Sequence, residues 1–497
     1  MHVTWRSKGD APVAEGQDQR SDAAITAEAS GLVLELCRAA GNRLRGKPAA
    51  FAQRVAAELA EPQIRIGVVG RVSSGKSTLV NSVLGHPVAP TDAGECTRVL
   101  TVYRHGDRLD AVVHLRNGRT LELPAPPPGE VVPELPLPPE DVAYLEVRLP
   151  SEPLRTVTLI DSPGISSGSG EASQQTHDLV SSRNTDVPGP DAIAFVLTQN
   201  LREDEYQLLH EVDLSNTLTS ASVHSVGVLT KADLVGGGGP DAWQSATALA
   251  RSIAESHRTL FAAVVPVIGL LAEAGNCVRL TDDDARLLST LAREWGQQDR
   301  ETVLLAPATF TAARSSVTEV QRHRLIATFG IAGVRALLRC IDDGVTGARA
   351  LNAACRRASG YDELEAALVY RFRERADALK ACRALSALLR AVHGRLGRQM
   401  SPADRTWLHN RIESVRFDPR THHILELEAL HKVLAGQVTL PDHLERDLVD
   451  LVDGGAQRSG ALGLAAWQEF EAWAISAGQR ALARVIIRSY AIVAESP

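Results

Sequence analysis

The sequence predicts an α/β domain with a mostly parallel sheet, joined to an elongated all-α helical-bundle trunk. Between about residues 62 and 308, short apolar runs alternate with stretches of helical periodicity, which is typical of a parallel sheet buried on both faces. From about residue 309 onward no strand signal remains. An aromatic content of only 4% also favours helices packed through Ala and Leu. We therefore expect the α/β domain at 62–308 and the trunk at 1–61 and 309–497.

Two helices are expected before the sheet, at 25–44 and 48–61, because Pro48 suits a first helical turn and Pro62 ends the second helix. Five buried strands are expected at 64–70, 157–161, 192–198, 224–230 and 261–269. Between the first two strands, segments 98–106, 109–116 and 119–124 predict an antiparallel excursion. Asn117-Gly118 is expected to form its type I′ hairpin turn.

Residues 361–392 predict the main helix of the C-terminal half. Their apolar side chains recur at three- and four-residue steps and form one stripe: Leu364, Leu368, Phe372, Ala376, Leu379, Cys382, Leu385 and Leu389. A helix of about thirty residues would be about 45 Å long, which suits an elongated bundle. The two N-terminal helices are expected to complete the same bundle.

Charge and composition exclude several classes of protein. The net charge of -7 argues against a polyanion as the main partner, so no nucleic acid is expected. The six cysteines lie far apart without a C-x-x-C pair, which predicts neither a zinc site nor a disulfide framework and fits a reducing cytoplasm. No run of about 18 apolar residues occurs, so any membrane contact is expected to be peripheral.

Residues 70–77 match the P-loop pattern G-x-x-x-x-G-K-[ST] and lie between a predicted strand and a predicted helix, which is the context that this motif requires. Main-chain amides would surround the phosphates, Lys76 would reach the β and γ phosphates, and the Ser77 hydroxyl would bind Mg²⁺. The predicted nucleotide-binding residues of this segment are Gly70, Arg71, Val72, Ser73, Ser74, Gly75, Lys76, Ser77 and Thr78.

Two further motifs follow in the order expected of a GTPase. Asp161-Ser162-Pro163-Gly164 comes directly after a strand, where Asp161 would hold Mg²⁺ through water and the Gly164 amide would meet the γ-phosphate. Thr230-Lys231-Ala232-Asp233 has the form [NT]-K-x-D. Asp233 could accept from both donors on the guanine edge, a pair that adenine lacks, while the stem of Lys231 covers the ring. The sequence thus predicts preference for GTP.

The switch threonine is expected between the P-loop helix and the first strand of the excursion. Thr97 is the first choice and Thr91 the second, and both rest on their order in the chain alone.

These segments together, with the switch segment 89–106 and FGIAGVRALL at 329–338, resemble the bacterial dynamin-like proteins, in particular their shorter isoniazid-inducible mycobacterial type. The resemblance is dense over 62–270 and looser beyond. It implies a large GTPase with a helical trunk, nucleotide-dependent self-association through the GTPase domain, and membrane remodelling at a trunk tip. It assigns catalytic roles to Lys76, Ser73, Thr97 and Gly164, and metal contacts to Ser77, Thr97 and Asp161.

The chain departs from the dynamin pattern at two positions. Val72 stands where eukaryotic dynamins carry a Gln that helps to place the attacking water, so hydrolysis is expected to be slow or to need a partner. Ser73 is retained at the next position, where dynamins use a Ser to hold a charge-compensating ion. Ile268 occupies the base-edge loop, where small or polar residues are usual, and is assigned to the nucleotide site on its position.

Segment 390–420 is the candidate membrane contact. It carries seven arginines against three acidic residues, an excess of four positive charges in an acidic chain. An anionic lipid surface attracts each such charge by about 1 kcal/mol. The candidate contact residues are Arg395, Arg398, Met400, Arg405 and Trp407. A solvated arginine-rich bend between two helices is the alternative for this segment.

The sequence therefore predicts a dynamin-like GTPase that remodels membranes, by fission or fusion, at the inner face of the cell membrane. It would be cytoplasmic and peripherally membrane-associated, with a homo-oligomer or a related dynamin-like protein as partner. One alternative is a soluble GTPase acting in ribosome or RNA assembly, although no compact basic RNA-binding module follows the motifs. The other is a structural protein that binds nucleotide with little turnover.

Overall fold

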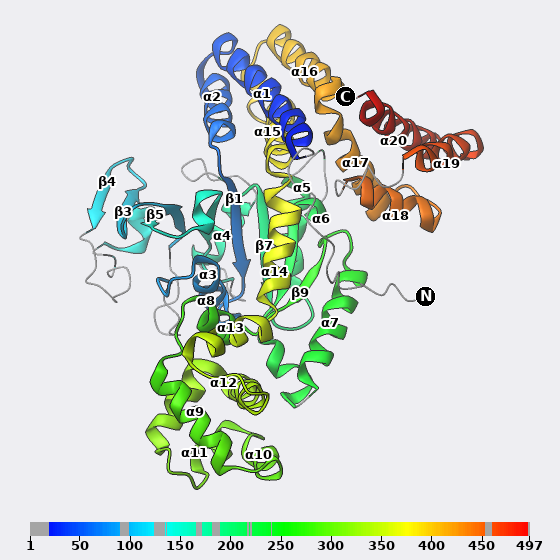
Figure 1. Cartoon of the computed structure of the whole chain (residues 1–497). Coiled ribbons are helices and arrows are strands. Elements are labelled where there is room, and N and C mark those ends of the chain that lie inside the picture. The colour runs from blue at the N-terminus through cyan, green and yellow to red at the C-terminus, as the bar shows by residue number, and fades with distance from the viewer. Residues whose placement is uncertain are drawn as a thin grey trace.

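The computed structural model describes residues 19–89, 99–123, 135, 137–165, 171–180, 189–215, 218, 221–239, 241–452 and 460–495. Within these residues the chain forms one central sheet with helices on both of its faces and helical groups at its two ends (Figure 1). No helix among the described residues combines the length and the hydrophobicity needed to cross a bilayer.

The sheet contains nine strands among the described residues, in the order β4-β3-β5-β2-β6-β1-β7-β8-β9. From β6 to β9 neighbouring strands are parallel, whereas β2 runs antiparallel to β6, and β3 runs antiparallel to β4 and β5. The strands are β1 (Ile64–Gly70), β2 (Thr101–His105), β3 (Asp110–Leu115), β4 (Thr120–Leu123), β5 (Val142–Leu149), β6 (Val157–Asp161), β7 (Ala192–Leu197), β8 (Ser225–Leu229) and β9 (Val264–Pro266).

The five predicted parallel strands are confirmed as β1, β6, β7, β8 and β9. Every residue of β1, β7 and β8 is buried, which explains their continuous apolar sequences. The hairpin between β3 and β4 is also confirmed, but its turn is not type I′. That turn needs positive φ at both central residues, and only Gly118 has it, at 81°.

Helices surround the sheet and connect its strands. Among them, α3 follows the P-loop and packs on α8, α7 packs on β8 and β9, and α14 also contacts β8 and β9. Their bounds are α3 (Lys76–Leu84), α4 (Glu171–Val180), α5 (Glu203–Ser215), α6 (Ala221–His224), α7 (Ala242–Ser256), α8 (Gly269–Asn276) and α14 (Tyr361–Leu368).

A second group of helices packs beneath the sheet, at the bottom of Figure 1, where α12 contacts α8 and α9 and α13 contacts α8. It comprises α9 (Asp282–Glu294), α10 (Gln297–Val303), α11 (Pro307–Ala312), α12 (Glu319–Asp342) and α13 (Ala348–Ala358). Helices from both sides of residue 308 thus pack together, and the predicted division at 62 and 308 stays a prediction.

The trunk bundle stands at the opposite end of the molecule and joins segments far apart in the sequence (Figure 1). In it α1 (Gln19–Arg43) and α2 (Gly46–Ala60) pack against α15 (Ala376–His393), and α1 also contacts α16 (Pro402–Arg416). The predicted long helix is interrupted, because a π-helical turn at Val369–Arg373 separates α14 from α15. The turn changes the register between the part packed on the sheet and the part packed in the trunk bundle.

The last four helices form a C-terminal lobe with a hydrophobic core of its own. They are α17 (His422–Leu434), α18 (Asp442–Asp450), α19 (Gly460–Trp473) and α20 (Ala477–Glu495). Asp447 ties the lobe together, because one of its carboxylate oxygens accepts from both Trp467 Nε1 and the Tyr490 hydroxyl, each at 2.7 Å.

Candidate functional site

The P-loop connects the end of β1 to the start of α3. Lys76 is the first residue of α3, and its Nζ donates to the Arg71 carbonyl oxygen at 3.0 Å. Ser73 and Gly75 have left-handed backbone conformations, with φ of 59° and 93°. These turns bring the chain tightly round the N-terminus of α3, where amide groups and the helix dipole favour a bound phosphate.

Two glycines of the motifs are required by close packing. A Cβ atom on Gly70 would lie 2.4 Å from the Val196 carbonyl oxygen, and one on Gly164 would lie 2.6 Å from Val72 Cγ2. The Val72 amide also donates to the Ile165 carbonyl oxygen at 3.1 Å. The DSPG segment therefore lies directly against the P-loop.

The predicted magnesium ligands come from neighbouring elements. Asp161 is the last residue of β6, is fully buried and pairs in register with Val68 of β1. Ser77 lies in the first turn of α3 and is partly exposed. A hydroxyl and a carboxylate are hard oxygen ligands of the kind that Mg²⁺ takes, and a cation would offset the cost of burying the Asp161 charge. These residues fit Mg²⁺, whose charge would stabilise a bound triphosphate.

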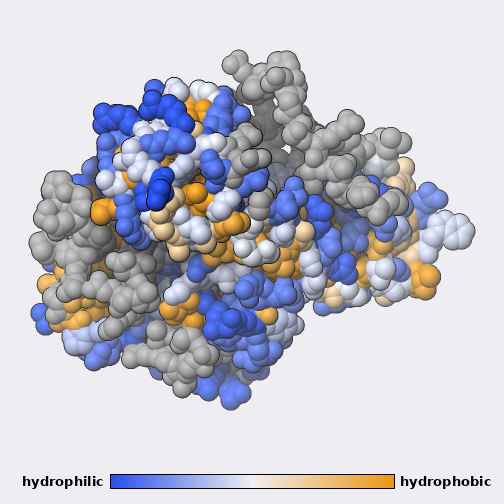
Figure 2. Space-filling model, turned by 90° about the horizontal axis from the view of Figure 1, so that it is seen from below, coloured by the Kyte–Doolittle hydropathy of each residue, from blue (hydrophilic) through white to orange (hydrophobic). Residues whose placement is uncertain are grey.

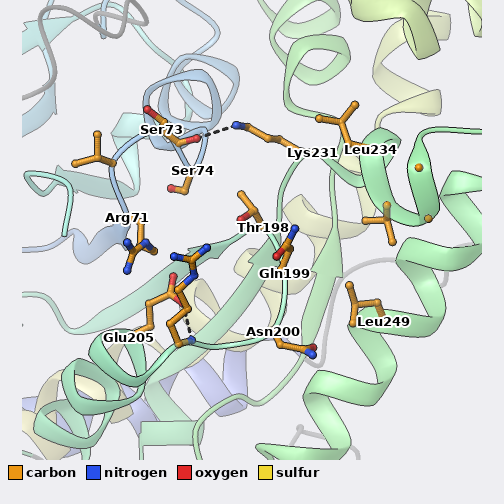
Figure 3. Close-up of a pocket in the computed structure, with 15 residues that line it drawn as sticks. Arg71, Ser73, Ser74, Thr198, Gln199, Asn200, Glu205, Lys231, Leu234 and Leu249 are labelled. Atoms are coloured by element: carbon orange, nitrogen blue, oxygen red, sulfur yellow. Dashed lines mark hydrogen bonds between the residues drawn. The ribbon is translucent and has the colours of Figure 1, made fainter. Parts of the chain in front are cut away.

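The TKAD segment is locked onto the P-loop by two side chains. Thr230 Oγ1 lies 2.5 Å from the Ser74 carbonyl oxygen and 3.1 Å from that of Leu197. Lys231 Nζ donates to the Ser73 carbonyl oxygen at 2.9 Å, and Figure 3 shows the side chain reaching across to the P-loop. The segment that would bind the base is therefore held at a fixed distance from the segment that would bind the phosphates.

Asp233 lies in the first turn of the 3-10 helix Ala232–Gly237 and is only partly exposed. Burial raises the pKa of its carboxyl group above the ordinary value, while a backbone hydrogen bond and the charge of Lys231 act in the opposite direction. A partly desolvated carboxylate of this kind discriminates strongly between bases that can and cannot donate to it.

Ile268 and Gly330 approach the base segment from two other elements. Ile268 precedes α8, and its side chain is 8% exposed and packs in the hydrophobic core. Next to it, the Val267 carbonyl accepts from the Ala232 amide at 3.3 Å. Gly330 breaks the regular helix of α12 with φ of 68°, and a Cβ there would lie 3.8 Å from Asp233 Oδ2. The FGIAGVRALL segment thus reaches the base motif.

A cavity of about 650 Å³ opens beside these motifs. Its wall contains Ser73 and Ser74 of the P-loop, Gln199 and Asn200 after β7, and Lys231, whose stem borders it (Figure 3). The volume is in the range of small-molecule sites, and the lining is polar rather than apolar.

Arg71 also lines this cavity, and its side chain points away from Ser73 and Ser74 (Figure 3). It makes a close ion pair with Asp204 of α5, and both side chains are partly exposed. The sequence assigned Arg71 to the nucleotide site as part of the P-loop pattern. In the structure its carbonyl contacts Lys76, whereas its guanidinium belongs to the α5 side of the cavity. Thr97 and Thr91 lie outside the described residues.

Comparison with known proteins agrees with this arrangement. The Dynamin family model matches residues 66–232, which contain the P-loop and the DSPG segment and end within TKAD. The isoniazid-induced protein IniC of Mycobacterium tuberculosis, from strains CDC 1551 / Oshkosh and ATCC 25618 / H37Rv, is 33% identical over 433 residues, 85% of this chain and 84% of the relative. This chain belongs to the dynamin family. It is a bacterial dynamin-like protein, and the resemblance predicted from its motifs is confirmed.

Two other similarities are weaker. A bacterial dynamin-like protein of Nostoc punctiforme is 38% identical over 56 residues, 11% of this chain and 8% of that protein. Among solved structures, a chain of an oligomerised bacterial dynamin pair, described as a mechanism for long-range sensing and tethering of membranes, aligns with a TM-score of 0.33 and 14% identity. That alignment covers 84% of this chain and 81% of the other.

The candidate membrane residues of this dynamin-family chain lie at the α15–α16 end of the trunk bundle. Arg395, Arg398 and Arg405 are exposed there. Met400 and Trp407 are only partly exposed and pack against the trunk core. Sequence reasoning missed a second contribution to this end, the turn between α1 and α2, which brings in the exposed cations Arg43, Arg45 and Lys47. The ion pair between Arg43 and Asp404, at 3.0 Å, joins the two turns.

Proposed function

We propose that this dynamin-family protein binds and hydrolyses GTP with Mg²⁺ and uses the reaction to remodel membranes at the inner face of the cell membrane. The observation that carries the nucleotide assignment is the double contact of Thr230 and Lys231 with the P-loop, which joins the base motif to the phosphate motif. Lys76 and the P-loop amides would stabilise charge on the triphosphate, and Thr97 and Gly164 would sense the γ-phosphate. Ser73 would hold a charge-compensating ion.

The basic end of the trunk bundle supports the membrane part of the proposal. The cations of the α1–α2 turn and of the α15–α16 turn, separated by some 350 positions in the chain, meet at one end of a negatively charged protein: Arg43, Arg45, Lys47, Arg395, Arg398 and Arg405. Such a cluster is attracted to an anionic lipid surface, and the attraction is screened by salt over about 8–10 Å. The GTPase domain lies away from this end, so a second copy, or a related dynamin-like protein, could associate through it.

Co-sedimentation with liposomes tests this proposal. The triple variant Arg395→Glu, Arg398→Glu, Arg405→Glu should bind anionic liposomes at least about a hundredfold more weakly than the parent, because each lost cation contributes about 1 kcal/mol. The matched control makes the same charge change on α7 and α9, at the exposed residues Arg251, Arg286 and Arg293. Equal liposome binding by the parent and the triple variant would show that these arginines only belong to a solvated bend between two helices.

The same assays, together with GTP turnover, would also identify two alternative functions. A GTPase that assembles ribosomes or RNA would turn over GTP without any response to liposomes. A structural nucleotide-binding protein would bind GTP with almost no turnover, which the exposed Val72 at the water-placing position of dynamins favours.

A further inference from the structure

The most exposed large apolar side chains of the described chain lie together in the turn between α19 and α20. Trp473 is 80% exposed and Ile475 is 92% exposed, two residues apart. By contrast, Trp467 of the same helix is fully buried in the core of the C-terminal lobe. Helix α19 therefore fixes the lobe with one tryptophan and presents the other to solvent.

The turn is held in place by its own hydrogen bonds. Arg480 donates to the Ala474 carbonyl at 2.7 Å, and the Gln479 side chain donates to the Thr439 carbonyl at 3.0 Å. At the start of α20, the Ser476 amide donates to Gln479 Oε1 at 3.0 Å. Exposure of the two apolar side chains is thus built into an ordered turn.

The turn itself carries no charge, and a row of arginines follows it along α20. No residue from Trp473 to Gln479 carries a charge, and the adjoining segment 436–441 carries none either. Behind the turn, Arg480, Arg484 and Arg488 are exposed and follow one another at four-residue spacing along one face of α20. The nearest acidic group on α19, Glu471, is paired with Arg484 at 2.6 Å.

The size of this surface decides between two kinds of occupant. A large apolar side chain buries at most about 150–250 Å², so two of them offer far less than the roughly 800 Å² per partner of a stable protein interface. A bilayer interface needs only a small apolar wedge that enters about 5–10 Å, with cations at the headgroup level behind it, and tryptophan favours that level.

We propose that the α19–α20 turn inserts Trp473 and Ile475 into the interface of an anionic lipid bilayer while the arginine row of α20 contacts the headgroups. The inference rests on the proposed membrane function and adds a second contact to it. The C-terminal lobe projects sideways from the trunk bundle, to the right in Figure 1, and hydrophobic residues stand among hydrophilic ones on the projecting part in Figure 2. This contact supplies the apolar insertion that the basic trunk end lacks, where Met400 and Trp407 are packed inward.

The test compares full-length variants by co-sedimentation with vesicles of phosphatidylcholine, with and without phosphatidylglycerol. The double variant Trp473→Ser, Ile475→Ser should bind anionic vesicles about tenfold or more weakly, since each side chain loses its burial in lipid. The control double variant Leu305→Ser, Val320→Ser removes two comparably exposed apolar side chains, 70% and 78% exposed, from the α10–α11 connection and from α12. Its binding should equal that of the parent.

A second measurement locates the contact directly. With brominated lipids, the parent should lose part of its tryptophan fluorescence, whereas Trp473→Phe should bind as the parent does and lose much less. Unchanged GTP turnover in solution would show that both turn variants are folded.

Three outcomes would overturn the inference, and they are distinguishable. If the parent does not bind anionic vesicles, the proposed membrane function itself is wrong. If the parent and the double variant bind alike, the membrane function stands and this turn has no part in it. If the double variant changes only the oligomeric mass in solution, the turn is a contact between protein chains.

Discussion

Replacing Asp191 by Asn should strongly destabilise the junction between the sheet and the trunk bundle. Asp191 lies just before β7, is 2% exposed, and accepts Arg65 Nε at 3.0 Å and Arg65 Nη2 at 2.9 Å. Arg383 of α15 lies 3.3 Å from the same carboxylate. The Arg383 guanidinium also pairs with Glu58 of α2, at 3.0 Å. One buried network therefore connects β1, which leads to the P-loop, with two trunk helices.

The magnitude follows from burial. Asparagine keeps the shape but removes the charge that compensates Arg65, whose side chain is only 2% exposed. Removing one partner of a buried ion pair costs about 3–5 kcal/mol, which corresponds to a melting temperature lower by roughly 6–20 °C for a large domain. The control Asp283→Asn, in an exposed pair with Arg286 and Arg324, should cost less than about 1 kcal/mol.

The pH dependence gives an independent check. Burial alone would raise the pKa of Asp191, but the charges of Arg65 and Arg383 and the hydrogen bonds from Arg65 outweigh it and lower the pKa to about 2. A depressed carboxyl pKa contributes stability above the unfolded value near 4, and that contribution, about 2–3 kcal/mol, is lost as pH falls through about 2. The melting difference between parent and Asp191→Asn should therefore shrink between about pH 5 and pH 2. A variant that melts with the parent at neutral pH would refute this account of the network.

Three further predictions concern the nucleotide site. Lys76→Ala should abolish GTP binding at micromolar nucleotide while circular dichroism stays unchanged, because a charge-assisted phosphate contact is lost; unaltered affinity by calorimetry would remove the P-loop assignment. Asp233→Ala should reduce the preference for GTP over ATP about tenfold to hundredfold, measured by competition, since a hydrogen bond to a charged group is worth roughly 1.5–3 kcal/mol; an unmodified protein that binds both nucleotides equally contradicts it. Val72→Gln should raise the rate of phosphate release from GTP with little change in GTP affinity, and a rate equal to or below that of the parent would show that the water is placed by other groups.

Features carried by local sequence could be predicted. The five parallel strands are continuous apolar runs because both of their faces are covered, and the three motifs follow strand ends in a fixed order. Strand β5 was missed, because it follows a proline-rich segment and carries Glu146 and Arg148. In the structure Arg148 pairs with Glu146 at 2.7 Å, which allows both charges in the strand.

Features that depend on contacts between distant segments could not be predicted. Nothing near Arg65 indicates that Asp191 and Arg383 will surround it, or that Arg43 will join the arginines that follow α15. The turn at 115–119 shows a finer limit. Asn117-Gly118 is a strong type I′ signal. In the structure, however, the Gly118 amide donates to the Leu115 carbonyl at 2.9 Å, and the Leu115 amide donates to the Arg119 carbonyl at 2.8 Å. These two bonds close a longer loop than a type I′ turn.

The most direct test of the central claim is the rate of GTP hydrolysis by the full-length protein with Mg²⁺, measured with and without anionic liposomes and beside the Lys76→Ala variant. We expect slow turnover of GTP that exceeds turnover of ATP, rises when anionic liposomes are added and disappears in the variant. Turnover that is equal for ATP and GTP, or that persists in Lys76→Ala, would contradict the assignment of a guanine-nucleotide site. A rate of GTP hydrolysis that stays unchanged with liposomes of every lipid composition would contradict the coupling of hydrolysis to membranes.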